Sequence, residues 1–245
     1  MLYSVRSERQ VCRAGACAGL SSDEHFTVDG TLLDAGASLK SFQPKNKQDA
    51  PPPDDRRNPT VDFHGEKRST EAHESKTGPD ALLARKGKGK ESKLSYNGNL
   101  LVENRNGLIV NAKLLQVNGL AERDAALLML EQIPSDGRIT AGKGLGTMEF
   151  VHECRHMNVT SHVAQNTARP GDSAIDARST RHAGHDVSQK RRERIEECVG
   201  WLKIIALLGQ LKRRGLFKVA CIFISAAAAC ILVQMRKLIP IPAAA

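Results

Sequence analysis

The sequence predicts a mixed α/β fold, in which one sheet is flanked by helices. Three observations lead to this prediction. Two runs of aliphatic and β-branched residues, 94–102 and 108–117, enclose turn-forming residues at 104–107, which indicates a hairpin. Short apolar runs at 139–141 and 162–164 then alternate with segments of helical periodicity. Strands that alternate with helices favour a sheet with helices on its faces.

The first part of the chain is expected to hold one strand and a long insertion. His25 to Val28 is a short strand that ends at Asp29, and a helix can begin with Leu32 and Leu33. The segment 44–60 is polar and contains five prolines, so we expect a disordered insertion after the first strand. Residues 1–20 lack periodicity and are assigned no structure, which leaves residues 21–240 as the folded domain.

Three helices are expected after the hairpin. The first spans 122–132, and the second starts at Thr147, whose side chain can cap it, and reaches about His156. The third is long and begins near Ser188, after a polar, basic loop. Its apolar stripe is Ile195, Val199, Leu202 and Ala206.

Val219 to Val233 is an uninterrupted run of apolar and small residues with two interpretations. Its 15 residues include five alanines and rise about 22 Å as a helix, whereas a hydrocarbon layer is about 30 Å thick. A buried terminal helix is therefore favoured, and a membrane anchor is the alternative. The N-terminus has no secretory signal, because Arg6, Arg9 and Arg13 interrupt every apolar stretch.

The composition indicates a basic cytoplasmic protein with a modest core. Its 245 residues are 40% hydrophobic and 4% aromatic, and the net charge of +9 favours a polyanionic partner, DNA or RNA before an anionic membrane surface. Six scattered cysteines indicate reduced thiols rather than disulfides. His152, Cys154 and His156 alternate as strand ligands would, but they match no usual zinc spacing and a helix would scatter them, so chance is favoured.

A basic segment is the first candidate binding site. Residues 85–93 read RKGKGKESK, with five bases and two glycines, which suits a flexible loop lying along phosphates. A solvated basic loop explains the same composition equally well. The candidate DNA-binding residues of this segment are Arg85, Lys86, Lys88 and Lys90.

The long helix carries the second candidate site. Glu196 and Lys203 lie about 40° and 20° around the helix axis from Arg192, so one acid projects between two bases on one face. Phosphodiester cleavage can use two Mg²⁺ ions held by three carboxylates. In a sheet of the expected order, Asp29 and the strand near residue 141 can lie beside Glu196. Favourable charge pairs on a solvated helix are the alternative.

At this point the sequence resembles bacterial insertion-sequence transposases with a DDE, ribonuclease H-like catalytic domain, over roughly residues 15–240. The matching segments are SSDEHFTVDGTLLDAGASLKSF, FHGEKRST, RKGKGKESKL, ENRNGLIVNAKL, HVAQNT, IDARSTRHAGHDVSQKRRERIEECVGWLK and LKRRGLFKVACIFISAAAA. The resemblance implies that Asp29 and Glu196 are the first and third catalytic acids and hold Mg²⁺. It also implies that Arg192 and Lys203 contact DNA at the element ends and target. A homodimer is compatible with it, whereas a small-molecule substrate and a membrane are not expected.

Four departures from the family pattern indicate a truncated, impaired copy. Gly142 stands at the second acid, and glycine offers no oxygen ligand; Asp136 and Glu149 are the nearest acids. Gln189 stands where a signature tyrosine is usual, and Gly36 where tryptophan is common. The helical segment that usually precedes the first catalytic strand has no match in this chain.

Four hypotheses remain open from the sequence. The first is an impaired transposase for DNA cleavage and strand transfer. The second is a non-catalytic DNA-binding remnant or repurposed module, the third a small basic membrane-attached protein, and the fourth an unproductive reading frame without a stable product.

Overall fold

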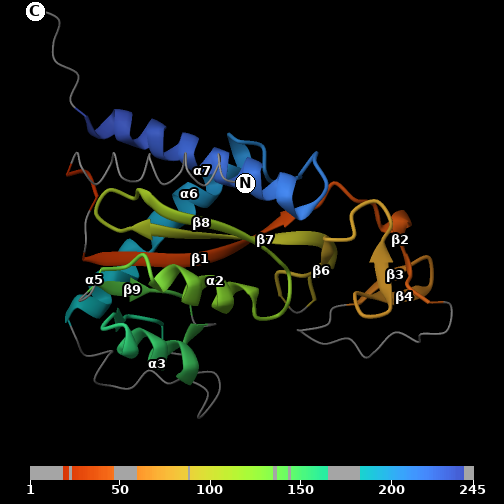
Figure 1. Ribbon diagram of the computed structural model, residues 1–245, viewed down its shortest axis with the longest axis horizontal. Helices are drawn as coiled ribbons and strands as arrows, with labels where there is room; N and C mark the ends of the chain where they lie inside the picture. Colours follow the sequence, from red (N-terminus) through yellow and green to blue (C-terminus); the bar gives the residue numbers. More distant parts are fainter. Residues whose placement is uncertain are drawn as a thin grey trace, which may run out of the picture.

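A mixed sheet forms the centre of the molecule in the computed structural model, which describes residues 19–21, 24–46, 60–87, 89–134, 137–142, 145–164 and 183–239 (Figure 1). Its strands are β1 (His25–Asp34), β6 (Leu82–Ala84), β7 (Lys93–Glu103), β8 (Ile109–Gln116), β9 (Arg138–Thr140) and β10 (Thr160–Ser161). The order is β10-β9-β1-β7, and both β6 and β8 pair with the far edge of β7. β9 and β10 are parallel to β1, whereas β7 is antiparallel to it. The predicted mixed α/β fold is therefore confirmed.

The β7–β8 hairpin, which the sequence predicts, is held by a buried carboxylate at its turn. Glu103 ends β7 and is fully buried. It accepts hydrogen bonds from the backbone N–H groups of Arg105 (3.0 Å), Asn106 (2.7 Å) and Leu108 (3.1 Å). Gly107 has a φ of 77°, a conformation that favours glycine. The turn residues thus help to fix the register of β7 and β8.

β1 is longer than the sequence indicates. We expected a strand that ends at Asp29 and a helix from Leu32, and both expectations are wrong. β1 continues to Asp34 and pairs with β7 as far as Ser95. Only a single 3₁₀ turn, η1 (Leu39–Ser41), follows. Local helix preference at the two leucines is weak, and ten residues of strand pairing override it.

Helices cover both faces of the sheet (Figure 1). They are α2 (Ala121–Leu130), α3 (Met148–His156), α5 (Ala183–Arg191), α6 (Glu193–Ile204) and α7 (Leu216–Leu238). Strand alternation divides the core, because successive side chains point to opposite faces. Leu100 packs with residues of α6 and α7, whereas the next residue, Leu101, packs with α2 and α3. The result is a sheet between two helical layers.

The predicted elements in the second half match closely, with two corrections. Thr147 caps α3 as expected, since its side chain accepts from Phe150 N. The strand expected at 162–164 is wrong, because β10 ends at Ser161. The long helix begins at Ala183 rather than Ser188, and an irregularity at Arg192 divides it into α5 and α6. Residues 165–182 of the expected polar loop lie outside the described residues.

The C-terminal run forms α7, which lies along one face of the sheet (Figure 1). It is the one described helix long and apolar enough to cross a membrane, with a mean hydropathy of 2.5. Its inner residues Val219, Phe223, Ala227 and Ile231 belong to the main core. Asp80 accepts a hydrogen bond from Leu216 N (2.9 Å) and so caps its first turn. The packing supports the predicted core helix over the membrane anchor.

The segment between β1 and β6 contains two small hairpin-like pairs that the sequence did not predict. They are β2 (Phe42–Pro44) with β5 (His73–Ser75), and β3 (Thr60–Phe63) with β4 (Glu66–Ser69). Arg68 Nη1 donates to the carbonyl oxygens of Leu39 (3.0 Å) and Phe42 (2.6 Å) and ties the pairs together. Both ends of the predicted disordered segment 44–60 therefore lie in strands, while residues 47–59 lie outside the described residues.

Gly36 lies in a space too small for a large side chain. Leu211 N donates to Asp34 O (2.8 Å), and Arg214 Nε donates to Gly36 O (2.8 Å), so the loop before α7 crosses the end of β1. A Cβ on Gly36 would lie 2.6 Å from the carbonyl oxygen of Leu211. The tryptophan of the resembling family has no room here, and the departure has a steric reason.

We expect Gly36→Ala to lower the free energy of unfolding by about 1–3 kcal/mol, because the new methyl group forces backbone away. Gly200→Ala on α6 is the matched control. No heavy atom lies within 4 Å of a Cβ there, so alanine should stabilise the helix by about 0.5–1 kcal/mol. Urea unfolding followed by circular dichroism measures both. Equal effects of the same sign would show that the loop does not constrain Gly36.

Candidate functional site

Asp29 lies in the middle of β1, on the face covered by α6 and α7. It pairs with Leu100, which packs in the core of that face, and its side chain is half-buried. Burial raises the pKa of Asp29 above its ordinary value. Arg192 opposes this shift, as does the Gly30 N–H, which donates to Asp29 Oδ1 (3.1 Å). The negative charge of Glu196 raises the pKa of Asp29 further, so the charges of Arg192 and Glu196 both act on the Asp29 carboxyl.

Gly142 faces the same point from the neighbouring strand. Thr140 of β9 is level with Thr27 of β1, and Gly142 follows Thr140 by two residues as Asp29 follows Thr27. A Cβ placed on Gly142 would lie 3.4 Å from Nη2 of Arg192 and 3.8 Å from its Cζ. The structure thus brings Asp29 of β1, Gly142 just after β9, Arg192 at the start of α6 and Glu196 of α6 into one region. The roles of these residues remain predictions.

A buried serine holds α5 against the sheet one turn before Arg192. Ser188 Oγ lies 2.9 Å from Nδ1 of His25 on β1 and 2.7 Å from Nδ1 of His162, next to β10. Gln189, at the position of the family's tyrosine, donates its side-chain amide to the His162 carbonyl. These bonds fix the start of α6 relative to β1. Sequence reasoning missed Ser188, because a serine within a helix gives no signal of its buried partners.

The second group of candidate residues meets near Asp34, the last residue of β1. Burial lowers the pKa of Lys203, and the charge of Lys86 lowers it further, while Asp34 opposes both. Lys93 pairs with Asp34 (3.4 Å). The basic segment and α6 are therefore neighbours, although they are far apart in the sequence. Lys90 is exposed like Lys86, Arg85 is half-buried, and Lys88 lies outside the described residues.

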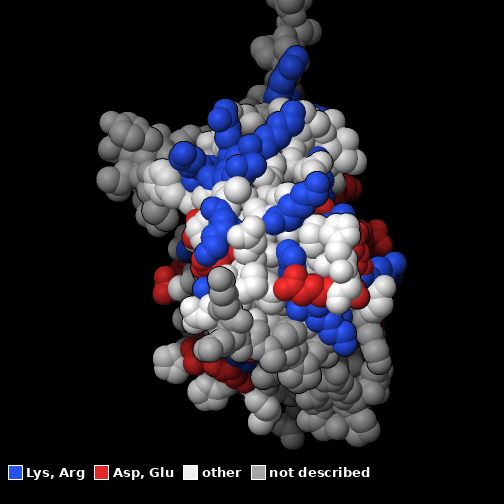
Figure 2. Space-filling view, turned by 90° about the vertical axis from the view of Figure 1, so that its right-hand side faces the viewer, with Lys and Arg blue, Asp and Glu red and all other residues white. Residues whose placement is uncertain are grey.

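Lys and Arg side chains gather on one face of the molecule. Figure 2 shows them spread over the upper part of this face, with Asp and Glu in smaller groups. Such a distribution is the electrostatic footprint expected of a polyanion-binding surface.

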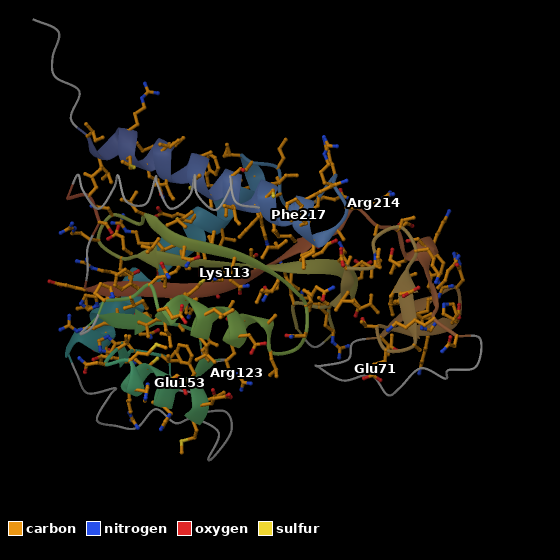
Figure 3. All side chains as sticks on the ribbon, in the orientation of Figure 1. Glu71, Lys113, Arg123, Glu153, Arg214 and Phe217 are labelled. Atoms are coloured by element: carbon orange, nitrogen blue, oxygen red, sulfur yellow. The ribbon has the colours of Figure 1, made fainter. Side chains whose placement is uncertain are left out.

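Glu149, one of the two acids nearest to Gly142 in the sequence, lies away from the site. Glu149 lies on α3 and pairs with Arg123 of α2 (2.9 Å), in the helical layer on the other face of the sheet. Figure 3 labels Arg123 below the strands, among α2 and α3. Asp136 lies outside the described residues.

The described residues do not fit the two-metal site that the resemblance implies. They contain no group of three or more His, Cys, Asp or Glu side chains that can hold a metal ion. At the site itself, the guanidinium of Arg192 borders Gly142, the position at which the resemblance implies a further carboxylate. The alternating His152, Cys154 and His156 lie on α3, where Cys154 is buried and its pKa is raised to about 12 by burial, while both histidines are exposed.

No protein-family model matches the sequence, and no curated protein matches it. Among solved structures, the chain is similar to the piggyBac transposase in a synaptic complex with hairpin DNA, with 10% identity and a TM-score of 0.43, covering 84% of this chain and 45% of that chain. The Mos1 chain of a pre-cleavage transpososome has 12% identity and a TM-score of 0.29, and the match covers 95% of this chain and 63% of that chain. A Mos1 mariner paired-end complex with Mn has 12% identity and a TM-score of 0.27, and the match covers 95% of this chain and 62% of that chain. The chain spans less than two thirds of the length of each of these proteins.

We expect Asp29→Asn to stabilise the protein at neutral pH by roughly 1 kcal/mol, as often occurs when an unfavourable site residue is replaced. Because the pKa of Asp29 is raised in the folded state, stability is lost as pH rises through the window above its ordinary value of 3.8. Asparagine does not ionise and avoids this loss. Urea unfolding at neutral and acidic pH measures the difference, which should vanish below pH 3.8.

Glu197→Gln is the control for this substitution, because Glu197 is an exposed carboxylate on α6. Its effect should stay within about 0.5 kcal/mol at both pH values. A loss of stability in Asp29→Asn at neutral pH would show that the attraction of Arg192 outweighs burial.

Proposed function

We propose that this chain is a transposase-derived domain of the DDE, ribonuclease H-like class that binds DNA and does not cleave it. The resemblance of several long segments to insertion-sequence transposases supports the class. The convergence of Asp29 and Glu196 supports descent from an acidic catalytic site. Gly142 supports the loss of cleavage, since the position beside them has no oxygen ligand to offer.

The observation that carries DNA binding is the meeting of Lys86 and Lys203. Each lysine comes from a different basic segment, and the positive charge of Lys86 lowers the pKa of Lys203. Two like charges held together destabilise each other, and an anion beside them removes the repulsion. DNA phosphates carry such charges at regular spacing along a backbone. Lys90, four residues after Lys86 in the same basic segment, is also exposed.

The helix connects this pair to the acidic site. Arg192 and Lys203 are separated by about 16 Å along the helix, which follows β1 from Asp29 toward Asp34. A DNA strand bound at Lys86 and Lys203 can therefore pass the point where Asp29 and Glu196 lie. With two carboxylates and no third acid, these residues cannot hold the two metal ions that activate water and stabilise the leaving oxygen.

The binding part of the proposal is tested with purified protein and a fluorescent DNA duplex. We expect anisotropy to report binding at low salt, and the logarithm of the binding constant to fall linearly with the logarithm of the salt concentration. No binding at low salt would refute it.

The catalytic part is tested with the same protein and DNA in the presence of Mg²⁺ or Mn²⁺. We expect no nicked or cleaved product on a denaturing gel. Cleavage by the unmodified chain would refute the proposed impairment while leaving the binding result intact.

A further inference from the structure

A buried serine of α5 lies between two histidines of the sheet region. Ser188 Oγ is 2.9 Å from Nδ1 of His25 on β1 and 2.7 Å from Nδ1 of His162, which follows β10. Ser188 is 0% exposed and His162 is 1% exposed. We call these three side chains the histidine–serine bridge. It joins two strands of the sheet to one helix.

The hydrogen bonds of the bridge determine where each ring carries its proton. Nη1 of Arg138 lies 3.1 Å from Nε2 of His25, and a guanidinium can only donate. Nε2 of His25 therefore accepts, and a neutral His25 carries its proton on Nδ1, where it donates to Ser188. The one hydroxyl proton of Ser188 is then donated to Nδ1 of His162. A neutral His162 therefore carries its proton on Nε2.

Protonation of either ring is incompatible with this pattern. A charged His25 has no lone pair with which to accept from Arg138. A charged His162 has no lone pair with which to accept from Ser188. The bridge as it stands therefore requires two neutral histidines.

The groups around His25 also favour its neutral form. Burial lowers the pKa of His25, and the positive charges of Arg138 on β9 and Arg191 on α5 lower it further, while Glu24 opposes them. The ring of His162 lies 6.2 Å from that of His25, between centroids. A charge on one of these rings therefore disfavours a charge on the other.

His162 faces a further titratable ring from the helix. The ring centroid of His185 on α5 lies 5.8 Å from that of His162. Nδ1 of His185 lies 3.8 Å from the exposed carboxylate of Asp186. Protonated His185 would repel a charge on His162, so α5 has a second reason to leave the sheet in acid.

We infer that the histidine–serine bridge is a pH-sensitive contact, which holds α5 on the sheet while both histidines are neutral and releases α5 when they are protonated. Arg192 N donates to the Ser188 carbonyl (3.1 Å), so the bridge also anchors the residue that borders Gly142. The position of Arg192 is thereby coupled to pH. The inference does not depend on the proposed function, because it involves neither DNA nor a metal ion.

Acid, rather than base, opens this contact. A histidine whose pKa is lowered in the folded state contributes stability above its ordinary value, which is 6.5 for His25, and this stability is lost as pH falls below 6.5. A helix can open locally at a lower free energy than the whole domain. We therefore expect α5 to open while α7 stays protected in the core.

Two measurements on the unmodified chain test the inference. Nitrogen NMR of the histidine rings at about pH 7.5 should find the proton of His25 on Nδ1 and that of His162 on Nε2. Amide hydrogen exchange, corrected for intrinsic rates, should show the protection of α5 falling roughly three- to tenfold between about pH 7.5 and about pH 5.5. The protection of α7 should stay constant.

Variants assign the effect to the bridge. Ser188→Ala should lower the protection of α5 already at neutral pH. The double variant His25→Gln with His162→Asn cannot ionise at either position, so its α5 protection should not depend on pH. His156→Asn is the matched control, because His156 is an exposed histidine on α3, and it should keep the pH dependence of the unmodified chain.

Three outcomes would overturn the inference. The first is a neutral His25 with its proton on Nε2, and the second is constant protection of α5 between the two pH values. The third is a folded double variant in which the pH dependence of α5 persists. If a variant does not fold, the NMR and exchange measurements on the unmodified chain still decide.

Discussion

A Phe223→Ala substitution is expected to lower the free energy of unfolding by about 3–5 kcal/mol. Phe223 is 0% exposed and lies at the centre of the inner face of α7. Its ring rests directly on the backbone of β7, since a Cβ on Gly98 would lie 2.8 Å from ring atom Cε2. Alanine would leave a cavity that the rigid sheet cannot close. Urea unfolding followed by circular dichroism measures the loss.

Phe217→Ala is the matched control, because this phenylalanine is on the same helix and 55% exposed. Figure 3 shows it at the start of α7, close to Arg214. Its effect should stay within about 0.5 kcal/mol. Similar small effects at both positions, together with a need for detergent during purification, would contradict the core role of α7 and support a membrane anchor.

Replacement of Lys86 and Lys203 together with alanine is expected to weaken DNA binding by roughly 10- to 100-fold, or about 1.4–2.7 kcal/mol. Each lysine that contacts a phosphate contributes about one unit to the slope of the logarithm of the binding constant against the logarithm of the salt concentration. The magnitude of this slope should therefore fall by about two. The folded state should not lose stability, because burial and repulsion already disfavour the charge of Lys203. Anisotropy titrations at several salt concentrations measure both quantities.

Arg155→Ala controls for the general loss of positive charge. Arg155 is exposed on α3, in the layer on the other face of the sheet from α6. It should change neither the affinity by more than about twofold nor the salt slope by a full unit. An equal loss in Arg155→Ala and in the double lysine variant would show that DNA binds the whole basic surface rather than the Lys86–Lys203 pair.

The site illustrates what can be predicted from sequence. Arg192 and Glu196 could be placed on one helical face, because the period of a helix is set by local geometry. Their position beside Asp29 could be expected from the element order, although Asp29 lies in the middle of β1 rather than at its end. The contact between Arg192 and Gly142 could not be predicted from the sequence, because it depends on how α6 packs against the sheet.

The sequence by itself determined the elements whose signals are local: the β7–β8 hairpin through its turn, α3 through the Thr147 cap, and the apolar α7. Only the tertiary structure decided the length of β1, the short strands of the insertion, and the meeting of Lys86 with Lys203. Those features depend on partners distant in the chain. Strand pairing and charge repulsion between distant segments arise only in the folded state. They therefore produce no periodic pattern in the sequence from which they could be predicted.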